Sequence, residues 1–262
     1  MLIHKDLPYS EQKTDVRLLD WFAPEGDCRA TMVWMHGGGI EGGDRRGFDG
    51  IASQLCAVGI GFVSVEYSLF PQARYPEFLL DCAAAAAFVH AECAKRQEHP
   101  RVFLGGSSAG AYLAMMLCFA RPYLLNAGVS PEDFAGYFFD AGQPTTHFNV
   151  LKYRGEDSRR CVVDEAAPLY HICDASPGRP IQILYADDDM PARPEQNEVL
   201  RATLQHFGYD MSLVEVEVMR GYSHCGYDNE EANGRWKIFS PFSGRGQIVT
   251  FPLILSLRCT AG

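Results

Sequence analysis

The residues that most constrain the fold are Gly106, Ser108 and Gly110, which lie between an apolar segment at residues 101–104 and an alanine-rich apolar segment at residues 109–119. A serine on a sharp strand-to-helix turn has a strained backbone, and its neighbours two positions away must be small for strand and helix to pack closely. The G-x-S-x-G spacing therefore predicts a strand, a tight turn and a helix. A plain tight connection would use the same residues, so the rest of the chain decides the role of the turn.

Strand-like and helix-like segments alternate on both sides of this turn. Short apolar, β-branched segments predict strands, and longer amphipathic or alanine-rich segments predict helices. The expected strands cover residues 16–22, 30–35, 60–67, 101–104, 134–140, 181–186 and 213–219, and the expected helices cover residues 48–58, 77–94, 109–119 and 193–207. This order predicts an α/β fold with a mostly parallel central sheet and helices on both faces.

The length favours one large α/β domain, so we expect a single domain over residues 1–262. Residues 141–180 interrupt the alternation with proline, aspartate, histidine and aromatic residues. We expect this interval to lie over the strand ends as a small lid or pocket wall. Residues 240–262 contain an apolar segment where a closing amphipathic helix is expected, and the sequence supports no assignment for them.

Charge and cysteine content restrict the partners and the location. The formal net charge of −10 argues against nucleic acid and anionic membrane surfaces, which need clustered lysine and arginine, and it favours a neutral substrate. Nine scattered cysteines without C-x-x-C spacing predict reduced thiols and a cytoplasmic protein. Residues 1–14 lack the apolar core of a secretory signal, and no apolar segment reaches the ~20 residues of a membrane-spanning helix.

A nucleophilic serine needs a histidine base and a carboxylate that orients the base. In an open parallel sheet such groups gather after the carboxyl ends of the strands. Among the eight histidines, His224 fits best, because it follows the last expected strand in a loop of small residues. His36 also follows a strand, but it precedes three glycines and is expected to shape their loop through a hydrogen bond. His147 and His171 lie in the irregular interval, either as substrate contacts or as structural residues.

Two aspartates compete for the role of the orienting acid. Three adjacent aspartates, ending in Asp189, follow the expected strand at residues 181–186, and Asp189 precedes a Met-Pro turn into the next helix. A calcium loop is a weaker interpretation of them, because no further oxygen ligands follow at a recognisable spacing. Asp140 ends the strand after the serine helix and stays an alternative. The chain order Ser108, Asp189, His224 favours Asp189.

A glycine-rich loop, His36-Gly37-Gly38-Gly39, directly follows the expected strand at residues 30–35. Backbone N–H groups at such a turn can stabilise a developing oxyanion without reorganising during the reaction. The amide of Ala109, at the start of the serine helix, is a second candidate donor. A phosphate cradle is the rival interpretation, but neither a Lys-Ser/Thr pair nor a G-x-G-x-x-G helix opening follows.

Together these motifs resemble the α/β-hydrolase superfamily, and within it the hormone-sensitive-lipase-like and related acetyl and carbohydrate esterases. The resemblance covers residues 30–227 and rests on the segments at residues 36–39, 65–71, 75–76, 81–82 and 106–110 and on Asp189 and His224. It implies Ser108 as nucleophile, His224 as base, Asp189 as orienting acid, an oxyanion hole of the Gly38, Gly39 and Ala109 amides, and neither cofactor nor metal.

The chain departs from this group at both ends. Residues 1–15 are too few for the large helical cap of lipase-like members, which implies a more open site, and residues 240–262 do not resemble the usual last helix. We predict a serine carboxylesterase that acts through an acyl-enzyme on short acyl esters, such as acetyl esters, including those on sugars. The alternatives are an amidase, such as a formamidase, or a peptidase on the same scaffold, and a non-catalytic ligand-binding receptor. The expected partner is a small-molecule ester, and the sequence is compatible with a homodimer.

Overall fold

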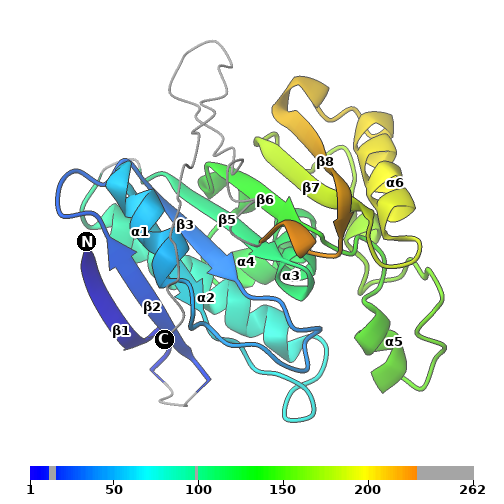
Figure 1. Cartoon of the computed structure of the whole chain (residues 1–262), viewed down its shortest axis with the longest axis horizontal. Helices are drawn as coiled ribbons and strands as arrows, with labels where there is room; N and C mark the ends of the chain where they lie inside the picture. Colours follow the sequence, from blue (N-terminus) through cyan, green and yellow to red (C-terminus); the bar gives the residue numbers. More distant parts are fainter. Residues whose placement is uncertain (12–15, 98–99, 229–262) are drawn as a thin grey trace, which may run out of the picture.

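The computed structural model describes residues 1–11, 16–97 and 100–228 (Figure 1). Its centre is an eight-stranded sheet in the order β1-β2-β4-β3-β5-β6-β7-β8. The strands are β1 (Leu2–Pro8), β2 (Leu18–Ala23), β3 (Ala30–Met35), β4 (Ile60–Val65), β5 (Val102–Ser107), β6 (Gly136–Asp140), β7 (Ile181–Asp188) and β8 (Val214–Ser223). The six neighbouring strands β4, β3, β5, β6, β7 and β8 pair in parallel. At the β4 edge, β2 pairs antiparallel with β4, and β1 pairs antiparallel with β2. The predicted mostly parallel sheet is confirmed.

Helices cover both faces of this sheet. They are α1 (Asp49–Ala57), α2 (Glu77–Ala94), α3 (Ala109–Phe119), α4 (Pro122–Asn126), α5 (Phe148–Tyr153) and α6 (Arg193–His206). Neighbouring strand residues point to opposite faces, so Met32 and Trp34 of β3 join an apolar cluster with α1, whereas Val33 and Met35 join a larger cluster with α2, α3 and α6. The site described below lies between these two layers of helices, at the carboxyl ends of the parallel strands.

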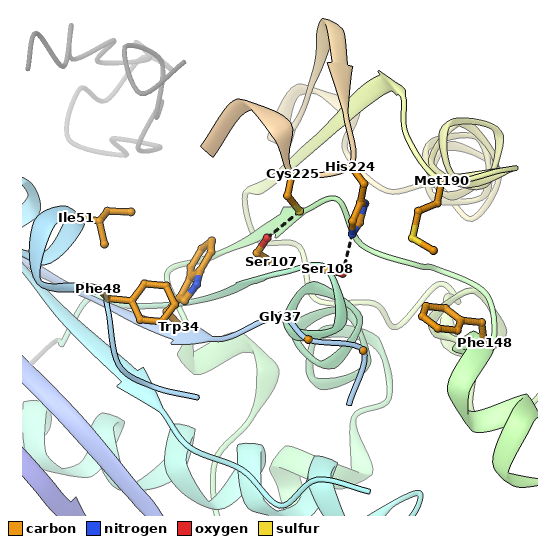
Figure 2. Close-up of a pocket in the computed structure, with 12 residues that line it drawn as sticks. Trp34, Gly37, Phe48, Ile51, Ser107, Ser108, Phe148, Met190, His224 and Cys225 are labelled. Atoms are coloured by element: carbon orange, nitrogen blue, oxygen red, sulfur yellow. Dashed lines mark hydrogen bonds between the residues drawn. The ribbon is translucent and has the colours of Figure 1, made fainter. Parts of the chain in front are cut away.

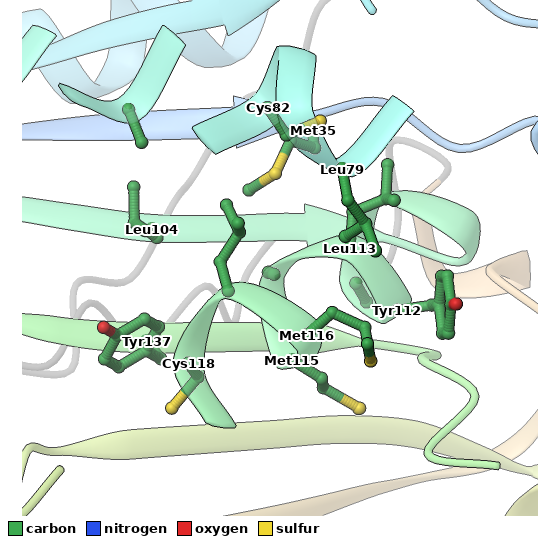
Figure 3. Packing of buried hydrophobic residues seen from close by; sticks show 14 of the residues in the cluster. Met35, Leu79, Cys82, Leu104, Tyr112, Leu113, Met115, Met116, Cys118 and Tyr137 are labelled. Carbon is green, nitrogen blue, oxygen red and sulfur yellow. The ribbon is translucent and has the colours of Figure 1, made fainter. Parts of the chain in front are cut away.

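Helix α3 is the centre of the larger core. All of its residues are buried, as expected for a helix that is apolar on every side. It packs on β5 and β6 and against α2, and Figure 3 shows Leu113, Met115 and Met116 among the surrounding apolar side chains. Cys82 and Cys118 are buried there as free thiols. The helix that follows Ser108 is therefore held on all sides.

The largest differences from the sequence prediction are in β1 and β8. Strand β1 was not expected, because nearly all of its side chains are exposed and show no two-residue alternation, so only its pairing with β2 defines it. Strand β8 runs on to Ser223 and so reaches the residue before His224. Residues 141–180 contain the short helix α5, and residues 240–262 lie outside the described part of the chain. No helix in the described ranges combines the length and the apolar character that crossing a membrane requires.

Candidate active site

Ser108 lies in a backbone conformation that a non-glycine residue rarely adopts, with φ 55° and ψ −113°, and α3 begins at the next residue. The turn is tight because the ends of β3 and β5 meet the start of α3. A Cβ atom on Gly110 would lie 1.9 Å from the carbonyl oxygen of Met35, and one on Gly106 would lie 2.4 Å from the carbonyl carbon of Gly110. The spacing that marks the turn in the sequence is thus a packing requirement. Strain of this kind concentrates at functional sites.

The predicted serine, histidine and aspartate meet at this turn. The Ser108 Oγ lies 2.8 Å from Nε2 of His224 (Figure 2), and the Nδ1 of His224 lies 2.6 Å from Oδ1 of Asp189. Asp189 follows β7 directly and its side chain is fully buried, whereas the His224 side chain is 24% exposed. Because Nδ1 donates to the carboxylate, Nε2 is the nitrogen that can accept the proton of the serine.

Asp140, the competing acid, has different partners. Its buried carboxylate accepts a hydrogen bond from the hydroxyl of Tyr227, and its backbone carbonyl accepts one from the N–H of Ser108 at 2.7 Å. The structure therefore brings Asp189 to the imidazole, and it places Asp140 where it supports the backbone of the serine turn.

The glycine loop after β3 lies beside Ser108. The carbonyl of Gly37 accepts a hydrogen bond from Nδ1 of His36 at 2.7 Å, so His36 shapes the loop as its position predicts. The carbonyl of Gly38 accepts from the N–H groups of Glu41 and Gly42, and Gly38 itself has a φ of +109°, which favours glycine. Backbone hydrogen bonds within the described residues leave the N–H groups of Gly38, Gly39 and Ala109 unused. These amides have the right chemistry for an oxyanion hole.

A cavity of about 510 Å³ opens over the serine (Figure 2). It is lined by Trp34, Gly37, Gly38, Gly39, Phe48, Ile51, Ser107, Ser108, Phe148, Met190, His224 and Cys225. Among these described lining residues none is a lysine, an arginine or a carboxylate. Figure 2 shows the Trp34, Phe48 and Ile51 side chains on one side of the serine, and Phe148 and Met190 on the other. The cavity suits a small uncharged molecule with an apolar group on either side of a reacting centre.

Helix α5 ties the irregular interval to the glycine loop. Asn149 is 3% exposed, and its Nδ2 donates to the carbonyl of Gly39 at 2.6 Å and to Glu41 at 3.1 Å. His147 accepts the N–H of Asn149 and so caps α5, and burial lowers its pKa to about 3. Of the two interpretations of His147, the structure supports the structural one. The sequence located this interval near the site but not Phe148 or Asn149, because single residues in an irregular segment have no pattern.

Comparisons with known proteins agree with this architecture. A family model described as alpha/beta hydrolase fold matches residues 32–125. Similar solved structures include a truncated carbohydrate esterase from gut microbiota, with 15% identity, a TM-score of 0.69 and coverage of 88% of this chain and 92% of that one. The propionate-bound Est2 esterase of the planctomycete Thermogutta terrifontis has 16% identity, a TM-score of 0.69 and 88% coverage of both chains. Esterase B of Lactobacillus rhamnosis has 16% identity, a TM-score of 0.69 and coverage of 88% and 81%. The chain therefore has the α/β-hydrolase fold that its motifs predicted.

Proposed function

We propose that the protein is a serine carboxylesterase that hydrolyses short-chain acyl esters, including acetyl esters of carbohydrates, through a covalent acyl-enzyme. The observation that carries this proposal is the chain of hydrogen bonds from Ser108 through His224 to Asp189 at the base of a cavity beside the glycine loop. The names of the similar structures, a carbohydrate esterase and an esterase with bound propionate, support the same class of substrate.

In the proposed reaction the Ser108 Oγ attacks the ester carbonyl carbon while Nε2 of His224 takes the hydroxyl proton. The carbonyl oxygen becomes an oxyanion that accepts hydrogen bonds from the amides of Gly38, Gly39 and Ala109. Asp189 stabilises the imidazolium of His224 through Nδ1. Removing one oxyanion donor typically costs on the order of 3 kcal/mol of transition-state stabilisation, so each of these amides should contribute strongly to the rate.

The second half of the reaction regenerates the serine. The protonated Nε2 of His224 gives its proton to the leaving alcohol oxygen, and the carbon–oxygen bond of the ester breaks to leave an acyl group on Ser108. A water molecule then loses a proton to His224 and attacks the acyl carbon. The collapse of this second intermediate returns the proton to Oγ and releases the carboxylic acid.

The cavity lining favours small, uncharged acyl groups. Its side walls are aromatic or aliphatic, and the described lining has no fixed charge that could pair with a charged substrate. Residues 141–180 contribute Phe148 to this wall, and we keep the prediction that they act as a lid within a single domain. The eight cysteines of the described residues are free thiols, which supports a cytoplasmic location as part of this proposal.

The test is the turnover of p-nitrophenyl acetate by the wild type and by Ser108→Ala. The variant should lose roughly a million-fold in kcat, because it lacks the nucleophile. Ser53→Ala, an exposed serine of α1, serves as the matched control and should keep full activity. Equal rates for the wild type and Ser108→Ala would overturn the proposal.

Two further measurements separate the alternative functions. A matched pair of ester and amide substrates distinguishes an esterase from an amidase, and we expect the ester to be the faster of the two. A fluorophosphonate probe should label Ser108 stoichiometrically. A wild-type protein that is folded but takes up no label would instead be a non-catalytic receptor.

A further inference from the structure

We propose that Glu66, held by Arg45, is a positioning residue for the ester hydrolysis proposed above: it keeps His36 doubly protonated, and His36 in turn aims the N–H of Gly38 at the oxyanion. The inference rests on the proposed function, because it assigns to residues behind the glycine loop the role of orienting that loop for the reaction. It is carried by a buried cluster of charged side chains that the reaction steps above do not use.

His36 has an acceptor at each of its ring nitrogens. Its Nδ1 lies 2.7 Å from the carbonyl oxygen of Gly37, and its Nε2 lies 3.3 Å from Oε1 of Glu66. A carbonyl oxygen and a carboxylate oxygen only accept hydrogen bonds, so both nitrogens must carry a hydrogen for both contacts to form. His36 is therefore an imidazolium. Tyr67 stacks on the ring with the centroids 4.3 Å apart, and its hydroxyl donates a hydrogen bond to the backbone carbonyl of His36.

The surrounding charges can stabilise this imidazolium although His36 is only 2% exposed. Arg45 donates from its guanidinium to Oε2 of Glu66 at 3.1 Å and to Oδ1 of Asp20 at 3.1 Å. The buried cluster thus holds two carboxylates and one permanent cation. A charged His36 balances it, whereas a neutral His36 would leave it with an uncompensated negative charge.

The groups that face His36 and Glu66 come from several elements. Around the buried pair Glu66 and Arg45, the polar groups are Asp20 of β2, Asp6 and Lys5 of β1, Tyr9, whose hydroxyl donates to the Glu66 carbonyl, and Tyr67. Asp6 and Lys5 lie at the rim and carry opposite charges. Tyr9 stays an uncharged donor, because burial raises its pKa. None of these groups supplies the additional positive charge that would balance Asp20 and Glu66 if His36 were neutral.

The protonated Nδ1 fixes the direction of an oxyanion donor. The peptide between Gly37 and Gly38 is trans and planar, so its C=O and N–H point in opposite directions. Because the Gly37 carbonyl faces the imidazole, the Gly38 N–H points away from it, on the side where Gly38 lines the cavity. Gly43 closes the loop over the same nitrogen, since a Cβ there would lie 2.7 Å from Nδ1. The positive charge also polarises this peptide and strengthens its N–H as a donor.

The test is Glu66→Gln, which keeps the shape of the side chain and removes its charge. We expect kcat for p-nitrophenyl acetate to fall about tenfold or more while KM changes less than about twofold, because the Gly38 donor acts on the transition state. A neighbouring negative charge favours the protonated form of a histidine. The variant should therefore lose activity at a lower pH on the alkaline side than the wild type does. Glu66→Asp should restore part of both properties.

Asp81→Asn is the matched control. Asp81 is likewise buried and likewise paired with an arginine, Arg17, at 2.9 Å, but it bonds to Ser68 rather than to the glycine loop. The Asp81→Asn substitution should lower the melting temperature, as Glu66→Gln does, but it should leave kcat and the pH profile unchanged. A Glu66→Gln enzyme whose kcat and pH profile match those of Asp81→Asn would overturn the inference.

A measurement without turnover separates this inference from the proposed function. The ¹⁵N and ¹H resonances of the His36 ring in Ser108→Ala, assigned by their loss in His36→Gln, should show two N–H groups at pH 7. A single ring N–H would overturn the inference even if the wild type is an active esterase. If the His36 ring carries two N–H groups but the wild-type protein hydrolyses no ester, the charge state of His36 is supported and the proposed esterase function is refuted. The same spectra decide the matter if Glu66→Gln does not fold.

Discussion

The carboxylate of Asp189 is held without contact with solvent, and its Oδ2 has no hydrogen-bond partner among the described residues. Its Oδ1 accepts from both Nδ1 of His224 and the N–H of Met190, each at 2.6 Å. A buried carboxylate with an unsatisfied oxygen destabilises the fold unless a nearby positive charge compensates it. Arg193, itself buried, interacts electrostatically with Asp189 in the resting protein. The proposed reaction adds a second positive charge, because His224 becomes an imidazolium when it takes the serine proton. The arrangement favours the transition state over the resting protein.

At the scale of this residue, Asp189→Asn should lower kcat for p-nitrophenyl acetate by about 10³–10⁴. The amide can no longer hold the imidazole in the tautomer that accepts the serine proton. Asp140→Asn should cost less than about tenfold, because the Asp140 carboxylate contacts Tyr227 and the serine turn uses only its backbone carbonyl. Steady-state kinetics of the two variants decide between the acids. A larger loss in Asp140→Asn would contradict the assignment of Asp189.

At the scale of the element, the start of α3 is fixed by a contact rather than by helix propensity. Gly110 is the second residue of α3, a position where alanine is normally the better helix former by about 1 kcal/mol. The missing side chain leaves room for the end of β3, whose Met35 carbonyl occupies the space of a Cβ. Steric exclusion therefore decides the residue at this position against its propensity.

Gly110→Ala should consequently destabilise the protein by about 3 kcal/mol or more, because the strand end must move. Gly50→Ala is the matched control: Gly50 is the second residue of α1, and a Cβ there meets nothing within 4 Å. This change should stabilise the protein by about 0.5–1 kcal/mol. Urea unfolding of both variants gives the two free energies. Equal effects of the two substitutions would show that backbone propensity, and not packing, governs the turn.

Helix α5 contributes a pH dependence through its cap. His147 is 1% exposed and accepts the N–H of Asn149, which requires an unprotonated nitrogen, and burial together with Arg193 lowers its pKa from 6.5 to about 3. The unfolded chain protonates this residue below pH 6.5 while the folded protein does not. Acidification therefore favours the unfolded state from pH 6.5 downward to about pH 3, where the folded protein also takes up the proton.

Between pH 6.5 and pH 5 the wild type should lose about 2 kcal/mol of its free energy of unfolding through His147 alone. His147→Asn keeps a side-chain acceptor at the cap and removes the titration. The variant should be less stable at pH 7, because it loses the ring contacts with Phe148 and Tyr112, but its stability should fall less over this pH interval. Urea unfolding at both pH values measures the difference. If the free energy of unfolding falls by the same amount in both proteins between the two pH values, the role of His147 is refuted.

At the scale of the whole molecule, local chemistry determined what the sequence could predict. The turn at Ser108, the strands at residues 30–35 and 181–186 and the helix at residues 109–119 each depend on neighbouring residues whose sizes and periodicity are visible in the chain. The meeting of Ser108, Asp189 and His224 could be predicted because parallel strands place their carboxyl ends at one edge. The bounds of these elements in the structure differ by a few residues at most.

The features that the sequence did not predict depend on partners far along the chain. Strand β1 forms only because β2 pairs with it, and its polar residues carry no alternation of their own. The contact from Asn149 to Gly39 joins residues 110 positions apart. The pairing of Arg45 with Glu66 spans 21 positions and links a loop to the end of β4. Such polar contacts have no periodicity, so only the folded arrangement identifies them.

The spacing of the site along the chain has a consequence for biosynthesis. Gly38 and Ser108 are translated before His224, which directly follows β8, the last described strand along the chain. A ribosome that stalls between Ser108 and His224 releases a polypeptide that carries the nucleophile without its base. Esterase activity in a cell extract would thus come only from molecules that were translated beyond β8 and include His224. Shorter products would be inactive.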